Sequence, residues 1–273
     1  MENHWESAFV EANGMRLHYL RTNGTGPAVV LAHGFSDNGR CWRRLVGALE
    51  SDFDLIMFDA RGHGQSDCPE TGYSLADQAA DIAGLVRALD LEKPALIGHS
   101  MGASSVAVLA AGYPDIPSRI VLEDPAWREP VEGEGDDGSR RQEWKKSAMD
   151  RKAKSLDEIT AEGREESPTW DEIEFEPWAE AKKQLSPNVF SWTAGADLSG
   201  WQETAEKISC PTLLVTAEPE LGSIVTDTIA TEARALCPSI EVAHLAGAGH
   251  NIRRERFYEF VDAVKAFLTP AQG

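Results

Sequence analysis

The sequence lacks several features, and each absence excludes a class of protein. It has no apolar run of about 18 residues, the length that indicates a membrane-spanning helix. The N-terminal stretch MENHWESAFVEANG has neither the basic nor the apolar segment of a signal peptide. The 4 cysteines are far apart and show neither a CxxC pair nor a metal-ligand spacing. We therefore expect a cytoplasmic protein with reduced thiols, no bound metal and no membrane partner.

Positive charge is also scarce. The chain has 26 Lys and Arg residues against 45 Asp and Glu residues, a formal net charge of −19. Nucleic acids and anionic membranes are bound by clustered basic side chains, so neither is an expected partner. The acidic excess mildly favours a neutral or cationic small-molecule substrate, although net charge bears mainly on solubility and association. The composition leaves both a monomer and a homodimer open.

The sequence does contain a regular alternation of strand and helix patterns. Short apolar runs typical of strands buried on both faces occur in PAVVLAHG, DLIMFDARGHG, PALIGHS, IVLED, CPTLLV and IEVAHLAG. Between several of them lie stretches with apolar residues at helical spacing, such as LADQAADIAGLVRALD. This order predicts an α/β fold with a mostly parallel central sheet flanked by helices. Asn13-Gly14 predicts a hairpin between two N-terminal strands, and hence one antiparallel strand at the edge.

One region interrupts the alternation. Residues 126–207 contain no strand pattern, but they hold charge-rich helical stretches and six of the 8 tryptophans. Because tryptophans need burial, we expect a helical cap here, inserted between two strands of a core made of residues 1–125 and 208–273. An aromatic cap favours a bulky, largely apolar substrate. Four of its tryptophans are candidates to bind that substrate, although core packing is the commoner role for each: Trp127, Trp178, Trp192 and Trp201.

A candidate nucleophile lies in the stretch Gly98-His99-Ser100-Met101-Gly102. This is the pattern G-x-S-x-G, and here it follows a strand pattern and precedes a helix pattern. In that context the serine sits on a sharp turn, and the flanking glycines leave room for close backbone approach. The amide groups at the start of the following helix can stabilise an oxyanion. The stretch therefore predicts Ser100 as the nucleophile.

A serine hydroxyl needs a base before it can attack. His250 lies just past the last strand pattern, in LAGAGHNI, where small neighbours leave room for the imidazole. We expect His250 to be this base. Structural roles are expected for His33, His63 and His99, and His244 is a weaker candidate.

These motifs together resemble those of serine hydrolases of the α/β-hydrolase fold. The resemblance covers nearly the whole chain outside 126–207, and it includes His33-Gly34-Phe35 and the turn DARGHGQS at 59–66. It implies that the backbone amides of Phe35 and Met101 form an oxyanion hole. It also implies catalysis without a metal or organic cofactor, with the nucleophile, acid and histidine in that chain order.

The acid of the triad has more than one candidate. The usual family position follows CPTLLV, where this sequence offers Glu218 and Glu220 but no Asp. Asp124, at the end of IVLED, falls where zearalenone-type lactonases and one subgroup of haloalkane dehalogenases carry their acid. Neighbouring strand residues point to opposite faces, so only one of Glu123 and Asp124 can meet the site. Asp124 is the preferred candidate and Glu220 the main alternative.

The residues favour hydrolysis of a carboxylic ester or lactone through an acyl-enzyme on Ser100. Haloalkane dehalogenases and epoxide hydrolases need an Asp where this chain has Ser100, so neither activity is expected. A cofactor-free perhydrolase and a carbon–carbon bond hydrolase are compatible with the same motifs. A non-enzymatic ligand receptor on this fold also remains an alternative, because fold alone does not decide function.

Overall fold

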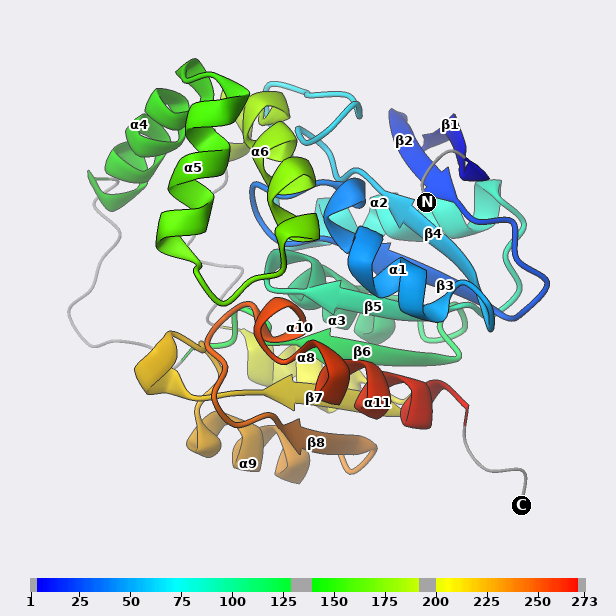
Figure 1. The fold of residues 1–273 in the computed structure, drawn as a ribbon. Coiled ribbons are helices and arrows are strands. Elements are labelled where there is room, and N and C mark those ends of the chain that lie inside the picture. The colour runs from blue at the N-terminus through cyan, green and yellow to red at the C-terminus, as the bar shows by residue number, and fades with distance from the viewer. Residues whose placement is uncertain (1–3, 129–138, 192–199, 270–273) are drawn as a thin grey trace.

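The structure, a computed structural model, describes residues 4–128, 139–191 and 200–269. Its centre is an 8-stranded sheet in the order β1-β2-β4-β3-β5-β6-β7-β8 (Figure 1). The strands are β1 (Glu6–Ala12), β2 (Met15–Arg21), β3 (Ala28–Ala32), β4 (Asp54–Phe58), β5 (Ala95–His99), β6 (Arg119–Glu123), β7 (Thr212–Thr216) and β8 (Ile240–His244). All pairs from β4 to β8 are parallel, whereas β2 is antiparallel to both β1 and β4. The predicted mostly parallel sheet is therefore confirmed.

The N-terminal hairpin turns at Asn13 and Gly14. Both residues have positive φ angles, 51° and 70°. A two-residue turn of this kind matches the twist of the flanking strands, and Asn-Gly is its favoured sequence. The hairpin places β2 as the single strand that runs against the others.

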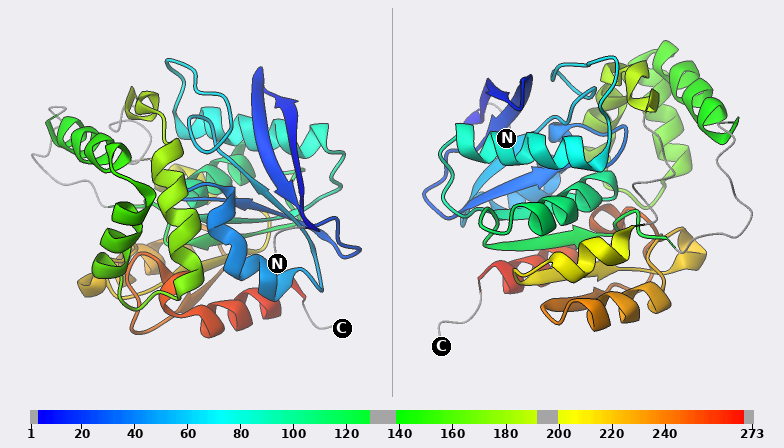
Figure 2. Two further views of the ribbon diagram at one scale, coloured as in Figure 1. Left: turned by 45° about the horizontal axis from the view of Figure 1, so that its top comes forward. Right: turned by 180° about the vertical axis from the view of Figure 1, so that it is seen from behind.

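Helices cover both faces of the sheet (Figure 2). One face carries α1 (Arg43–Leu49) and α11 (Phe257–Leu268), and the other carries α2 (Leu75–Ala88), α3 (Met101–Gly112), α8 (Trp201–Lys207) and α9 (Asp227–Leu236). The buried strands alternate between the two cores: Val29 and Leu31 pack towards α1 and α11, whereas Val30 packs towards α2 and α3. Among the described helices, none has the length and apolar content to cross a membrane.

Three further helices, α4 (Ser139–Ala153), α5 (Leu156–Glu166) and α6 (Phe175–Gln184), lie beyond the carboxyl ends of the parallel strands (Figure 1). Short 3-10 turns, η3 (Glu172–Glu174) and η4 (Pro187–Ser191), flank α6. In contrast, Trp201 of α8 belongs to the core cluster that contains α3. The apolar side of α8 thus packs on the core, whereas α4, α5 and α6 lie over the strand ends.

A buried network of charges joins these helices to the core. At its centre, the Asp37 carboxylate accepts hydrogen bonds from Lys182 Nζ of α6 at 3.2 Å and from Arg254 Nη2 of α10 (Ile252–Glu255) at 2.9 Å. Arg253 bridges Asp37 and Glu123 at 3.3 and 3.1 Å, and Arg254 also reaches Glu174 of η3 at 3.2 Å. Burial alone would raise the pKa of Asp37, but Arg254, Lys182 and Arg253 together hold it well below its usual range.

The close approach of α3 to β3 depends on Gly102. A Cβ atom at this position would lie 2.2 Å from the Ala32 carbonyl oxygen and 2.6 Å from that of His33. We expect Gly102→Ala to lower the free energy of unfolding by about 1–3 kcal/mol in urea titrations, because α3 must move away from the sheet. The control is Gly112→Ala at the end of the same helix, where a Cβ would meet nothing within 4 Å. Equal losses in both variants would contradict the close-packing explanation.

The network around Asp37 generates a second prediction. Asp37→Asn should lower the free energy of unfolding at neutral pH by about 3–5 kcal/mol, since it leaves buried cations without their counter-charge. Because the folded chain holds the pKa of Asp37 below its usual range, the stabilisation is fully present above the unfolded pKa of about 3.9 and is lost below it. The difference between wild type and variant should therefore shrink as the pH of the urea titrations falls below about 4.

The matched control is Asp52→Asn, which breaks an exposed pair with Lys265 at 2.9 Å. Exposed pairs contribute little, so its unfolding midpoint should stay close to that of the wild type at every pH. A similar small effect in Asp37→Asn would show that the buried network does not hold the cap and core together.

Candidate active site

Ser100 lies on a sharp turn between β5 and α3. Its φ of 53° and ψ of −115° are strained for a residue with a side chain, and its N–H donates to the Glu123 carbonyl at 2.9 Å. A Cβ at Gly98 would lie 2.5 Å from backbone atoms of Ala103, so only glycine fits there. The sequence thus builds a tight strand-to-helix turn that presents the Ser100 hydroxyl at the carboxyl edge of the sheet.

His250 lies between Ser100 and a carboxylate. Its Nε2 is 2.9 Å from Ser100 Oγ, and its Nδ1 is 2.6 Å from Asp124 Oδ2. The backbone around it is also held, since His99 Nε2 donates to the His250 carbonyl at 2.9 Å. The structure therefore brings together Ser100, Asp124 and His250, the three residues expected to form the triad.

Asp124 is completely buried at the end of β6, in the left-handed conformation with a φ of 42°. Besides His250, its carboxylate accepts hydrogen bonds from Ser223 Oγ at 2.8 Å and from the N–H groups of Ile224 and Val225 at 3.0 and 2.9 Å. These three bonds end on Oδ1, and the Ile224 N–H also lies 2.9 Å from Oδ2, so both oxygens are held and Oδ2 faces the imidazole.

The other candidate acids lie elsewhere. Glu220 is exposed on η5 (Pro219–Leu221). Glu218 accepts from the N–H groups of Gly247 and Ala248, at 2.5 and 3.2 Å, and so fixes the loop that leads to His250. Glu123 points away from Asp124 and binds Arg253. Of the four carboxylates considered, only Asp124 contacts the His250 ring.

Two backbone amides at the site have no hydrogen-bond partner among the described residues. Phe35 and Met101 both line the pocket, and neither N–H donates a hydrogen bond to any other described residue. Two histidines hold the loop that carries Phe35: His33 Nδ1 is 2.8 Å from the Gly34 carbonyl, and His63 Nε2 accepts from Ser36 N at 3.3 Å. Burial lowers the pKa of His33, and burial together with His33 lowers that of His63 to about 3, so both rings stay neutral.

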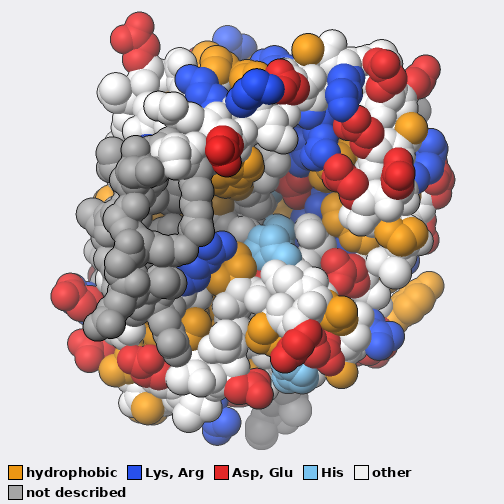
Figure 3. Space-filling model, turned by 90° about the vertical axis from the view of Figure 1, so that its left-hand side faces the viewer, with side chains coloured by type: hydrophobic (Ala, Val, Ile, Leu, Met, Phe, Trp, Pro, Cys, Tyr) orange, Lys and Arg blue, Asp and Glu red, His pale blue; other side chains and the backbone are white. Residues whose placement is uncertain are grey.

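These groups open into a pocket of about 480 Å³ at the carboxyl edge of the sheet. The space-filling view shows it as a hollow with a histidine in its floor and apolar and basic side chains around it (Figure 3). Its walls carry Trp144, Trp170 and Trp178. Trp178 was expected there, whereas the other two were not singled out in the sequence.

The remaining candidate tryptophans do not line the pocket. Trp127 is only 3% exposed and stacks on Trp201 in the core, with ring centroids 5.2 Å apart and planes 17° apart. Of the four candidates, Trp127 and Trp201 thus pack in the core cluster that contains α3 rather than against the pocket. Trp192 lies outside the described residues.

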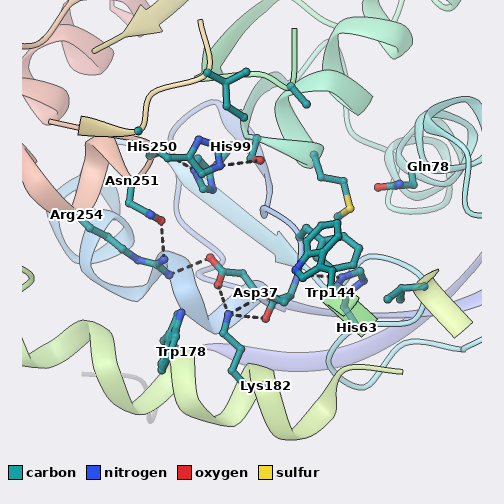
Figure 4. Close-up of a pocket in the computed structure, with 18 of the residues that line it drawn as sticks. Asp37, His63, Gln78, His99, Trp144, Trp178, Lys182, His250, Asn251 and Arg254 are labelled. Carbon is teal, nitrogen blue, oxygen red and sulfur yellow. Dashed lines mark hydrogen bonds and ion pairs between the residues drawn. The ribbon is translucent and has the colours of Figure 1, made fainter. Parts of the chain in front are cut away.

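The polar side of the pocket was not foreseen. Within the described part of the chain, its charged lining consists of Asp37 and three cations, Arg128, Lys182 and Arg254. Figure 4 shows Lys182 and Arg254 converging on Asp37. A signal was present in the sequence, because Asp37 follows Phe35 by two positions and Arg253-Arg254 follow His250 closely. The described residues contain no cluster of three or more His, Cys, Asp or Glu side chains that suits a metal ion.

Known proteins share both sequence and structure with this chain. It is 40% identical to 2-(acetamidomethylene)succinate hydrolase of Mesorhizobium japonicum over 122 residues, which make up 45% of this chain and 44% of the relative. It is 40% identical to N-formylmaleamate deformylase of Pseudomonas putida over 128 residues, 46% of each chain. The matched segments thus span less than half of either curated relative.

Structural similarity extends much further along the chain. The crystal structure of E-2-(acetamidomethylene)succinate hydrolase superposes with a TM-score of 0.83 at 25% identity, over 97% of this chain and 99% of the other. A family model described as the alpha/beta hydrolase fold matches residues 27–253. The chain therefore belongs to the alpha/beta hydrolase fold family.

Proposed function

We propose that this chain is a serine hydrolase that cleaves a carboxylic ester, a lactone or an amide through an acyl-enzyme on Ser100. The observation that carries the proposal is the hydrogen-bonded series from Ser100 Oγ to His250 to Asp124, at 2.9 and 2.6 Å. Amides join esters and lactones as candidates because one similar protein is named as a deformylase of an N-formyl compound.

The geometry supports a two-step reaction. Ser100 Oγ attacks the acyl carbon while its proton passes to His250 Nε2, and the carbonyl oxygen becomes an oxyanion held by the Phe35 and Met101 amides. When the bond to the leaving group breaks, that group takes the proton from Nε2. A water molecule then attacks the acyl-enzyme, gives a proton to Nε2, and releases the acid as the proton returns to Ser100.

Asp124 acts on the histidine rather than on the substrate. Its carboxylate accepts from Nδ1, which leaves Nε2 unprotonated and facing Ser100 before attack. When Nε2 takes up a proton, the buried negative charge stabilises the imidazolium. Because Ser223 and two backbone amides fix this carboxylate, the imidazole is held in one orientation through both steps.

Substitutions at the three residues test the reaction. Ser100→Ala and His250→Ala should each lower kcat by roughly 10⁴-fold or more, and Asp124→Asn by roughly 10³- to 10⁴-fold, since removing triad members has effects of this size. The measurement is steady-state hydrolysis of a panel of methyl esters, lactones and N-acyl amides. The control is Glu220→Gln, an exposed carboxylate that should leave kcat unchanged. Near-normal turnover in Ser100→Ala would refute the proposal.

Labelling separates a hydrolase from a ligand receptor on the same fold. A fluorophosphonate probe should react with Ser100 in the wild type, because His250 activates the hydroxyl. Mass spectrometry should locate the adduct on Ser100 and find none in His250→Ala under the same conditions. An unlabelled wild-type chain would favour the receptor.

A further inference from the structure

The charge of the pocket is opposite to that of the whole chain. The chain carries a formal net charge of −19, yet among the described residues the charged groups that line the pocket are three cations and one carboxylate. Field lines concentrate in a cleft with low-dielectric walls, and aromatic rings form part of these walls. The local field therefore favours an anionic ligand, in contrast to the neutral or cationic substrate that net charge alone favoured.

Two of the three cations are already bound to the protein. Lys182 Nζ donates to the Ser36 carbonyl at 2.9 Å, to Ser36 Oγ at 3.0 Å and to Asp37 at 3.2 Å, which accounts for its three hydrogens. Arg254 bonds Asp37, Glu174 and Asn251. Their charges face the pocket, but most of their donors are occupied.

Arg128 is different. It is exposed and lines the pocket, and within the described part of the chain no carboxylate or other acceptor meets its guanidinium. Five N–H donors in a planar fork are thus available, and this geometry matches a carboxylate bidentately. An ion pair within the protein would occupy these donors, but Arg128 forms none with the described residues.

The backbone that carries Arg128 is fixed to the triad. Arg128 follows Asp124 by four positions, and its carbonyl accepts from Trp201 Nε1 at 3.2 Å. Between them, Ala126 N donates to Ser104 Oγ at 3.0 Å and the Trp127 ring is buried in the core. The Cα atom of Arg128 is therefore held in a fixed position relative to Asp124 and His250.

We propose that the substrate carries a carboxylate in addition to the acyl group attacked by Ser100, and that Arg128 binds this carboxylate. The inference rests on the proposed function, because it assigns the second anchor of the same substrate. Arg128 acts here as a specificity-determining residue: it holds one end of the substrate while Ser100 reacts at the other.

The test compares monomethyl esters of succinate, glutarate and adipate, which keep one carboxylate, with the neutral dimethyl esters of the same acids. The measured quantity is the ratio of kcat/KM for the monomethyl ester to that for the dimethyl ester, at the chain length that reacts fastest. Arg128→Gln should lower this ratio roughly 10- to 100-fold, the loss of a hydrogen-bonded charge pair. Arg128→Lys should retain part of the preference. Arg87→Gln, an exposed arginine outside the pocket, should keep the wild-type ratio.

Calorimetry separates binding from turnover. Monomethyl succinate, glutarate and adipate are titrated into the Ser100→Ala variant and into the double variant Ser100→Ala/Arg128→Gln. Arg128→Gln should raise the dissociation constant roughly 10- to 100-fold. If no ester is hydrolysed but this loss is seen, the proposed reaction is wrong and the carboxylate site stands. If esters are hydrolysed but Arg128→Gln leaves the ratio unchanged, or if binding never depends on Arg128, the inference is overturned.

Discussion

The whole site depends on the buried carboxylate of Asp37. It follows Phe35 by two positions, and it binds Lys182 from α6 and Arg254 from α10, the short helix after His250. A carboxylate at this depth is stable only with cations beside it, and those cations come from different parts of the chain. One electrostatic requirement therefore fixes the loop that carries Phe35, the segment from His250 to α10, and α6 relative to each other.

The end of β6 connects this network to Ser100 and His250. Glu123 turns to one side and binds Arg253, while Asp124 turns to the other and binds His250. The strand ends at Glu123 and Asp124 turns in the left-handed conformation, and the two adjacent carboxylates meet different partners: one joins the charge network and the other contacts the imidazole. The Glu123 carbonyl also accepts the Ser100 N–H, which ties the sharp turn to the same strand end. A shift of Glu123, Asp124 or Ser100 would therefore disturb the hydrogen bonds of the other two.

Local charge and total charge have separate consequences in this protein. Acidic residues dominate the chain, but the described pocket lining has only Asp37 against three cations. Aromatic walls add apolar area from Trp144, Trp170 and Trp178. The pocket is thus suited to a ligand with both an apolar body and an anionic end. A bulky, wholly apolar substrate would leave the fork of Arg128 without an acceptor.

The sequence by itself determined the sheet, the turn at Ser100 and the position of His250, because periodicity and short motifs are local properties of the chain. Only tertiary structure brings Asp124, rather than Glu220, to the His250 ring, because His250 lies 126 residues beyond Asp124 in the chain. It also moved Trp127 into the core and gathered Asp37, Lys182 and Arg254 at one point. Composition does not specify which side chains meet when helices pack over strand ends; burial and charge pairing across distant segments do.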